Sequence, residues 1–115
     1  DLPSAPLPEQ PLHFIRDCLS SGQIRWTYHA TMRLEQRSLG SEILLKGAGS
    51  LEVIESYPDD KYLPSFLLRG EFEGRVFHTQ IATDVEARNI RVVTVYIPSP
   101  EEWDSEFRTR RRTQP

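Results

Sequence analysis

The sequence predicts an α+β fold: N-terminal helices packed on a four-stranded antiparallel sheet that runs as a meander, followed by a short C-terminal helix. Apolar residues recur at helical spacing in the first third of the chain, and from residue 51 onward they alternate with a period of two. Short polar turns separate the strand-like stretches, which is typical of an antiparallel meander. Because the helices precede the strands and do not alternate with them, the class is α+β and not α/β.

The first helix is predicted over residues 11–21, with a proline at its first turn and a glycine directly after its end. Residues 24–27 are predicted to be an extended lead-in to a second helix, which Thr27 caps and Gly40 ends. A brief helix over 42–46 follows. In the first helix one apolar stripe is expected to face the core, and it comprises Leu12, Phe14, Ile15, Cys18 and Leu19.

Four strands are predicted over 51–56, 66–72, 75–83 and 90–97. The last strand is expected to turn Val93, Val95 and Ile97 toward the helices. After it, Ser99-Pro100-Glu101-Glu102 is a helix-start signature, because serine is a good N-cap, proline suits the first position and glutamate the third. A final short helix is therefore expected, with Trp103 placed to dock on the sheet.

The length of 115 residues suits one domain with an apolar core that needs neither disulfides nor metal. We divide the chain into a flexible leader (1–10), a single domain (11–107) and an Arg-rich tail (108–115). The net charge of −3 argues against a domain that coats nucleic acid non-specifically. Contact with nucleic acid therefore requires a local basic site; alternatively, a basic partner covers the acidic surface.

The lone cysteine, Cys18, excludes an internal disulfide framework and a cysteine zinc site, and it suits a reducing compartment. The three histidines lack the spacing of a metal motif, so neither metal nor cofactor is expected. No stretch approaches the roughly 18–20 apolar residues that a membrane span needs. The start lacks the pattern of a signal peptide. These observations predict a cytoplasmic protein without a membrane partner.

A basic stripe is expected on the second helix, where His29, Arg33 and Arg37 stand at i, i+4 and i+8 and so share one face. Apolar residues flank this stripe on both sides, as at the rim of a cleft. An imidazole beside two guanidiniums suits a phosphate-handling site, because one group titrates near neutrality while the others stay charged. Alternatively, the arginines only pair with surface carboxylates and His29 caps the helix.

The strands offer further polar candidates. Thr94 and Tyr96 lie on one face of the last strand, roughly 7 Å apart, which is the reach of a phosphate and its neighbouring sugar. Alternatively, they are ordinary residues of a half-exposed sheet face. His78, on the third strand, either joins His29 to supply an acid and a base or pairs with a carboxylate on a neighbouring strand. The other face of that strand, with Phe77, Thr79 and Ile81, is expected to be buried.

The chain has no glycine-rich phosphate loop and no serine-elbow motif, which excludes P-loop enzymes, kinases and common hydrolases. Imidazole, arginines and hydroxyls without metal fit the transesterification of RNA. In that reaction a base takes the 2′-hydroxyl proton, a cation stabilises the phosphorane and an acid protonates the leaving oxygen.

Several short patterns occur in one order: His29-Ala30-x-x-Arg33-x-x-x-Arg37, Tyr57-Pro58, Gly74-Arg75-Val76-Phe77-His78, Val93-Thr94-Val95-Tyr96 and Pro100-x-x-Trp103. Together they resemble the domain-of-unknown-function 4258 family over about residues 24–108. The resemblance implies a relation to RelE-like toxins, within the barnase–EndoU–colicin–RelE ribonuclease fold. It implies metal-independent cleavage of RNA (mRNA or tRNA, free or on the ribosome) and an antitoxin partner in a bacterial toxin–antitoxin pair or polymorphic toxin. The positions that match are His29, Arg33, Arg37, Thr94, Tyr96 and, as a weaker addition, His78.

We therefore interpret the chain as a small ribonuclease-like toxin domain. In this interpretation His29 is the acid or base, Arg33 and Arg37 hold the scissile phosphate, and Thr94 and Tyr96 position the sugar-phosphate backbone. One alternative is a non-enzymatic protein- or peptide-binding module on the same scaffold, which the acidic charge favours. Another is a protein that binds a small ligand or phosphate.

Overall fold

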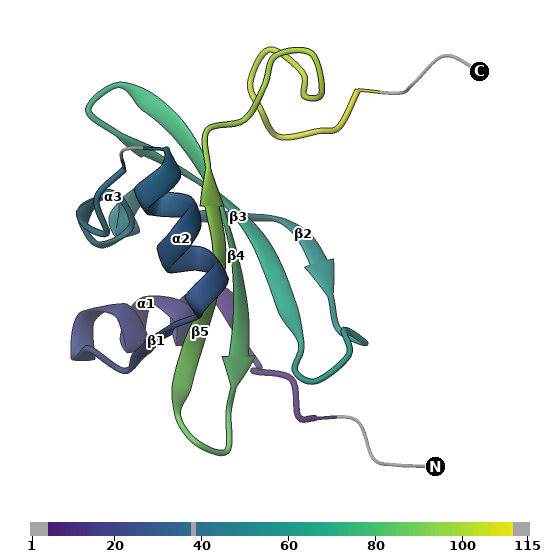
Figure 1. The fold of residues 1–115 in the computed structure, drawn as a ribbon. Helices are drawn as coiled ribbons and strands as arrows, with labels where there is room; N and C mark the ends of the chain where they lie inside the picture. The colour runs from purple at the N-terminus through teal and green to yellow at the C-terminus, as the bar shows by residue number, and fades with distance from the viewer. Residues whose placement is uncertain (1–4, 38, 112–115) are drawn as a thin grey trace.

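A computed structural model of the chain describes residues 5–37 and 39–111. It has a five-stranded mixed sheet with the helices gathered on one of its faces (Figure 1), so the predicted α+β class is confirmed. The strand order across the sheet is β1-β5-β4-β3-β2. In chain order the elements are α1 (Pro11–Ser21), β1 (Ile24–Trp26), α2 (Tyr28–Gln36), α3 (Glu42–Lys46), the 3₁₀ turn η1 (Ala48–Ser50), β2 (Glu52–Tyr57), β3 (Ser65–Phe72), β4 (Arg75–Asp84) and β5 (Asn89–Tyr96).

The prediction of a purely antiparallel four-stranded sheet is wrong by one strand. β2, β3, β4 and β5 pair antiparallel in chain order, but the expected lead-in is itself a strand, β1, which pairs parallel with β5. Ile24 lies opposite Ile90, and Trp26 lies opposite Val92. Three residues are too few to show a sequence period, so only the pairing with β5 in the folded structure reveals this strand.

The helix boundaries follow local rules. Gly22 ends α1 in the left-handed conformation (φ 77°), and Thr27 caps α2 by accepting a hydrogen bond from the Ala30 N–H at 3.0 Å, as predicted. However, α2 ends at Gln36, before the predicted Gly40, because the Leu39 N–H folds back to the Leu34 carbonyl at 2.8 Å. That bond belongs to a Schellman-type ending.

The predicted orientation of β5 is partly wrong because the strand contains a bulge. Gln80 pairs with Thr94 but Ile81 pairs with Val92, which leaves Val93 as the extra residue. The alternation of faces therefore shifts by one. The core receives Val92 and Val95, both fully buried, while Val93 is only half-buried and Ile97 is 36% exposed.

The predicted C-terminal helix is absent, and residues 98–111, named here the C-terminal loop, fold back on themselves. The loop begins as the signature predicts, because the Ser99 hydroxyl accepts from the Glu101 N–H. The Asp104 carboxylate then accepts from the N–H groups of Glu106 and Arg108, which draws the backbone away from a helix. Trp103 nevertheless docks on the sheet as expected and is only 1% exposed.

The predicted leader and tail lie only partly within the described residues. Residues 1–4 and 112–115 lie outside the described residues, but Pro8, within the predicted leader, is buried. Arg108 and Arg110, assigned from the sequence to the tail, both form ion pairs with β2. Contacts with β2 therefore extend past residue 107, where the sequence places the end of the domain.

The core fills the space between the helices and the sheet, and Phe77 on β4 lies at its centre with no exposed surface. As predicted, Thr79 and Ile81 share its buried face. Two glycines make room for the phenyl ring: a Cβ at Gly70 would lie 2.5 Å from the ring, and a Cβ at Gly47 would lie 2.6 Å from it. The ring thus contacts the backbone of the neighbouring strand and of the α3–η1 turn.

We expect Gly70→Ala to destabilise the fold, because neither the buried Phe77 ring nor the β3 backbone has space to move. The cost of such overpacking is about 1–3 kcal/mol. Gly49→Ala is the matched control, since nothing lies within 4 Å of the Cβ position there. Urea unfolding measures both variants, and equal stabilities would contradict the role of Gly70 in seating Phe77.

Candidate functional site

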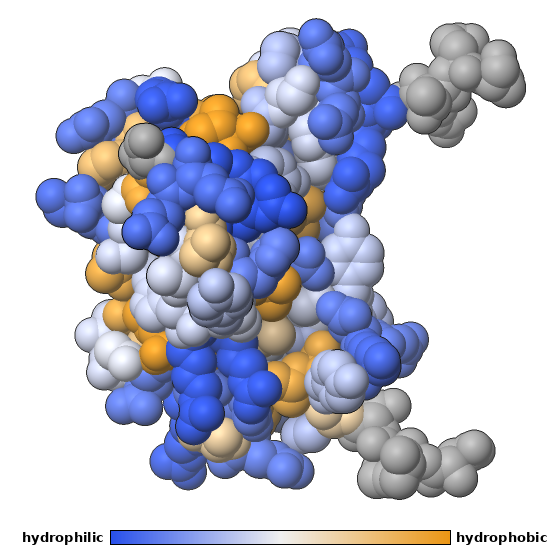
Figure 2. Space-filling model, viewed as in Figure 1, coloured by the Kyte–Doolittle hydropathy of each residue, from blue (hydrophilic) through white to orange (hydrophobic). Residues whose placement is uncertain are grey.

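The basic stripe of α2 is exposed, and hydrogen bonds join Arg33 to His29 and Arg37 to β5. The Arg33 Nε donates to the His29 Nε2 at 3.3 Å, and the Arg37 Nη1 donates to the Val95 carbonyl at 2.9 Å. Figure 2, which views the molecule from the α2 side, shows hydrophilic surface on this helix beside apolar patches. The three side chains therefore share one surface, next to the C-terminal half of β5.

Two features fix this stripe in place. Thr27 caps the start of α2 and also donates its hydroxyl proton to the Val92 carbonyl at 3.0 Å, which ties the helix to β5. Ala30 and Leu34 are buried in the core, so the opposite part of the helix faces solvent. The stripe thus stands on a rigid element, as a site that must hold its geometry requires.

The sequence left open whether the arginines merely pair with carboxylates. Among the residues described, no ion pair includes Arg33 or Arg37. The helix cap is Thr27 and not His29. Because His29 Nε2 accepts the bond from Arg33, the proton of the neutral ring is on Nδ1 in this arrangement. Nε2 is then the nitrogen that can accept a proton.

His78 and Tyr96 lie on the opposite face of the sheet, so His78 does not join His29. The side chains of β4 alternate, with Phe77 toward the helices and His78 away from them. His78 is fully buried beneath the C-terminal loop. Its Nδ1 lies 3.1 Å from the Tyr96 hydroxyl, and its Nε2 lies 2.8 Å from the Phe107 carbonyl.

Burial determines the protonation of both groups. Burial lowers the pKa of His78, and burial raises the pKa of Tyr96 to about 12. The neutral His78 ring therefore donates its Nε2 proton to the Phe107 carbonyl and accepts the Tyr96 hydroxyl proton at Nδ1. Both side chains are occupied by structural hydrogen bonds while the C-terminal loop is in place.

Thr94 is half-buried on the same face as Tyr96, opposite Gln80. The predicted site residues thus form two groups, the stripe on α2 and the polar residues of the far sheet face. Arg37 connects them, because the carbonyl that it binds belongs to Val95, between Thr94 and Tyr96 in β5. The two groups meet at one end of β5.

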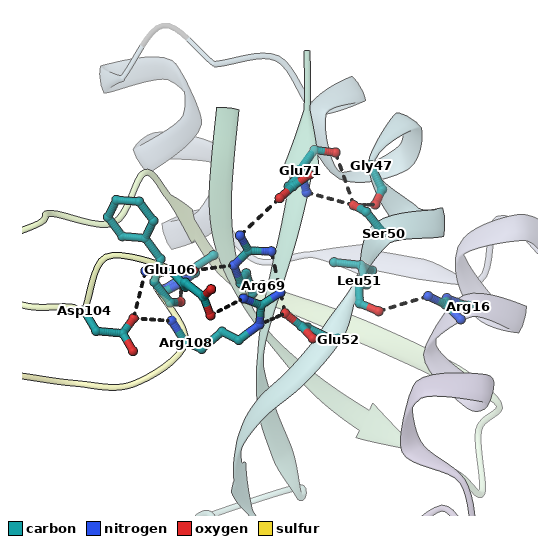
Figure 3. A network of polar contacts seen from close by, with 12 residues as sticks. Arg16, Gly47, Ser50, Leu51, Glu52, Arg69, Glu71, Asp104, Glu106 and Arg108 are labelled. Carbon is teal, nitrogen blue, oxygen red and sulfur yellow. Dashed lines mark hydrogen bonds and ion pairs between the residues drawn. The ribbon is translucent and has the colours of Figure 1, made fainter. Parts of the chain in front are cut away.

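A polar row on the far face was not predicted. Strand register aligns Glu52, Arg69, His78 and Tyr96 across β2, β3, β4 and β5. Figure 3 shows Arg69 reaching from the sheet toward the C-terminal loop, where its Nε donates to the Glu106 carbonyl at 2.8 Å. The sequence carries no signal for this row, because its members are neighbours only through pairing between strands.

Among residues 5–37 and 39–111, no group of three or more His, Cys, Asp or Glu side chains is placed to hold a metal ion. No helix in the described part of the chain is long and apolar enough to cross a membrane. A hollow of about 170 Å³ lies beside the start of α2, and its lining includes Thr27, Lys61 and Arg91.

Comparison with known proteins identifies a matching family. A family model described as a domain of unknown function (DUF4258) matches residues 26–97, which is more than half of the chain. No curated protein and no solved structure matches. The matched region contains α2, with its basic stripe, and the strands β2 to β5; it ends one residue before the C-terminal loop.

We expect acid to destabilise the fold through His78. Because its folded-state pKa is below the ordinary value of 6.5, the unfolded chain binds a proton that the folded chain does not. This contribution to stability is present above the ordinary value and is lost as the pH falls below it, by up to about 1.4 kcal/mol per pH unit. Urea unfolding between about pH 7 and pH 5 measures it.

The expected result is a flatter pH dependence for His78→Gln than for wild type, whatever its absolute stability. His13→Gln, which alters an exposed histidine of α1, should keep the wild-type slope. A slope unchanged in His78→Gln would show that His78 is not the group that titrates.

Proposed function

The chain belongs to the DUF4258 family, and we propose that its domain cleaves RNA without a metal ion, using the basic stripe of α2. The observation that supports this proposal most directly is the exposed contact between His29 and Arg33, with Arg37 on the same helix face. An unprotonated imidazole nitrogen next to guanidiniums can accept a proton while the cations hold a phosphodiester.

The proposed reaction is attack of a ribose 2′-oxygen on the adjacent phosphorus. His29 Nε2 takes the 2′-hydroxyl proton, the new bond to phosphorus forms, and the bond to the 5′-oxygen breaks. The leaving oxygen takes a proton from water, and the RNA strand ends in a 2′,3′-cyclic phosphate. Arg33 turns from His29 to the phosphate and, with Arg37, stabilises the charge that develops on its oxygens.

Thr94 and Tyr96 complete the proposal as residues that position the sugar-phosphate backbone. Arg37 supports this placement, because it binds the strand between them. We further propose a RelE-like fold, mRNA or tRNA as the substrate, the cytoplasm as the location and a basic antitoxin as the protein partner. The net charge of −3 favours a basic partner of this kind.

A non-enzymatic peptide-binding module remains the alternative function. It is favoured by a separate observation, namely the way in which the far sheet face holds the C-terminal loop through backbone carbonyls and arginine side chains. The two functions are centred on opposite faces of the sheet and meet at Thr94 and Tyr96 of β5.

We expect wild-type protein in excess chelator to cleave RNA into fragments that end in 2′,3′-cyclic phosphate. His29→Ala should lose roughly 10²–10⁴-fold in rate, the usual contribution of a general acid or base. His13→Ala, at an exposed histidine on α1, should cleave like wild type. Intact RNA with all three proteins, without and then with ribosomes, would eliminate the cleavage proposal and favour the binding module.

Arg33→Ala should lower kcat/KM by roughly 10²-fold or more, because it removes the cation closest to His29. Arg33→Lys should recover part of that loss, since lysine keeps the charge but not the planar fork of donors. Arg25→Ala, on the exposed side of β1, serves as the control for a lost positive charge. Full activity of a folded Arg33→Ala protein would disprove the assigned role.

A further inference from the structure

We propose that the sheet face opposite the helices is a recognition surface for an arginine-bearing protein segment, and that the C-terminal loop occupies this surface in place of a partner. The inference goes beyond RNA cleavage and does not depend on it. Its basis is a set of contacts that bind the loop in the way a peptide is bound: donors for backbone carbonyls, carboxylates for guanidiniums and an aromatic contact.

The first element of the surface is a pair of donors for consecutive carbonyls. Arg69 Nε donates to the Glu106 carbonyl, and His78 Nε2 donates to the Phe107 carbonyl, each at 2.8 Å. Arg69 and His78 are directly paired across β3 and β4. Because these bonds go to backbone oxygens, they hold a peptide of any sequence in one register.

The second element is a pair of carboxylates on β2 that select arginine. Glu55 accepts two hydrogen bonds from the Arg110 guanidinium, at 2.8 and 3.1 Å, and Glu52 accepts one from Arg108 at 2.6 Å. A two-bond contact with a carboxylate fits the planar fork of arginine and not the point charge of lysine. Although burial acts to raise it, the bonds from Arg110 and Tyr57 hold the pKa of Glu55 below its ordinary value.

The third element is an aromatic anchor. The Trp103 indole meets the His78 ring edge to face, with the ring centres 4.5 Å apart, and it is almost fully buried. The Arg110 guanidinium covers the indole at 4.6 Å from the ring centre. Arg110 therefore links the aromatic contact to Glu55, a grouping of tryptophan and arginine typical of binding hot spots.

The loop is attached in a way that permits its release. The core formed by the helices and the sheet includes no residue of the loop among its described members. The loop pairs with itself, since the Asp104 N–H donates to the Thr109 carbonyl and the Arg111 N–H to the Glu102 carbonyl. Its departure would thus break no pairing between strands, although it would expose the buried Trp103 indole. The exposed ion pairs that also hold the loop are individually weak. The family match also ends before the loop begins.

The charge of the sheet face beneath the loop indicates which kind of partner it would bind. Without the loop, the part of this face that it covers presents the carboxylates of Glu52, Glu55 and Glu71 around the Arg69 guanidinium. The excess of negative charge attracts a cationic segment. The fitting partner is a protein segment with an aromatic residue and two arginines spaced as Trp103, Arg108 and Arg110 are.

The test is binding of a labelled peptide of residues 98–111 to full-length protein. The double variant Trp103→Ala, Arg110→Ala removes the main anchors of the resident loop. We expect the peptide to bind this variant saturably, and at least roughly tenfold more tightly than wild type, in which the surface is occupied for most of the time. Circular dichroism checks that the variant is folded.

Two controls define specificity. A peptide with Arg108→Lys and Arg110→Lys should bind roughly tenfold more weakly, and Glu55→Gln added to the double variant should weaken the native peptide similarly. Absence of saturable binding to the folded double variant, or equal affinity of the two peptides, would overturn the proposal.

If the double variant does not fold, amide hydrogen exchange of the wild-type protein tests whether the loop leaves the sheet face. The Arg111 amide should exchange well before the amides of β4, and excess peptide should accelerate its exchange further. Exchange of the Arg111 amide only together with the amides of β4 would overturn the proposal. Since no readout uses RNA, this result is independent of the cleavage assay.

Discussion

Burial of β4 on both faces is the constraint on which the rest of the structure depends. Its alternate side chains must be covered from two sides: Phe77 and Ile81 by the helices, and His78 by the C-terminal loop. The helix side is apolar and closely packed, to the extent that glycines stand where a side chain would meet the Phe77 ring. The loop side is polar, and its contacts are hydrogen bonds and ion pairs around a single buried indole. The helix layer and the C-terminal loop therefore bind to the two faces of β4 with different strengths and by different chemistry.

This difference explains the distribution of candidate functions. A closely packed helix layer holds the basic stripe of α2 at a constant distance from β5, which suits a site that must keep its geometry during a reaction. The polar contacts around Arg69 and Glu55 exchange readily with water or with another chain, which suits reversible recognition. Tyr96 lies between the two regions, because it follows the Val95 carbonyl that Arg37 binds and its own hydroxyl donates to His78.

Local sequence signals predicted what depends on neighbouring residues. Pro11, Gly22 and Thr27 predicted the helix ends correctly, because capping involves only a few consecutive residues. Short polar turns between the strands were expected for the same reason, and Glu73 and Gly74, which join β3 to β4, have the positive φ of a tight hairpin. The stripe of His29, Arg33 and Arg37 follows from helical periodicity alone. Two of the predictions that failed concern longer-range pairing, namely the parallel strand β1 and the bulge at Val93. The early end of α2 and the loop in place of a helix after Ser99 instead reflect local hydrogen bonds that compete with the expected structure.

The sequence by itself thus determined the α+β class, the order of the helices α1 to α3 and of the antiparallel strands β2 to β5, the buried face of β4 and the basic face of α2. These features follow from periodicity and capping within each segment. Only the tertiary structure decided that His78 faces away from His29. It also decided that Glu52, Arg69, His78 and Tyr96 form one row, and that arginines near the chain end bind β2. The physical reason is register: residues far apart in the chain become neighbours only when strands pair and a loop docks on them, and no local pattern encodes that alignment.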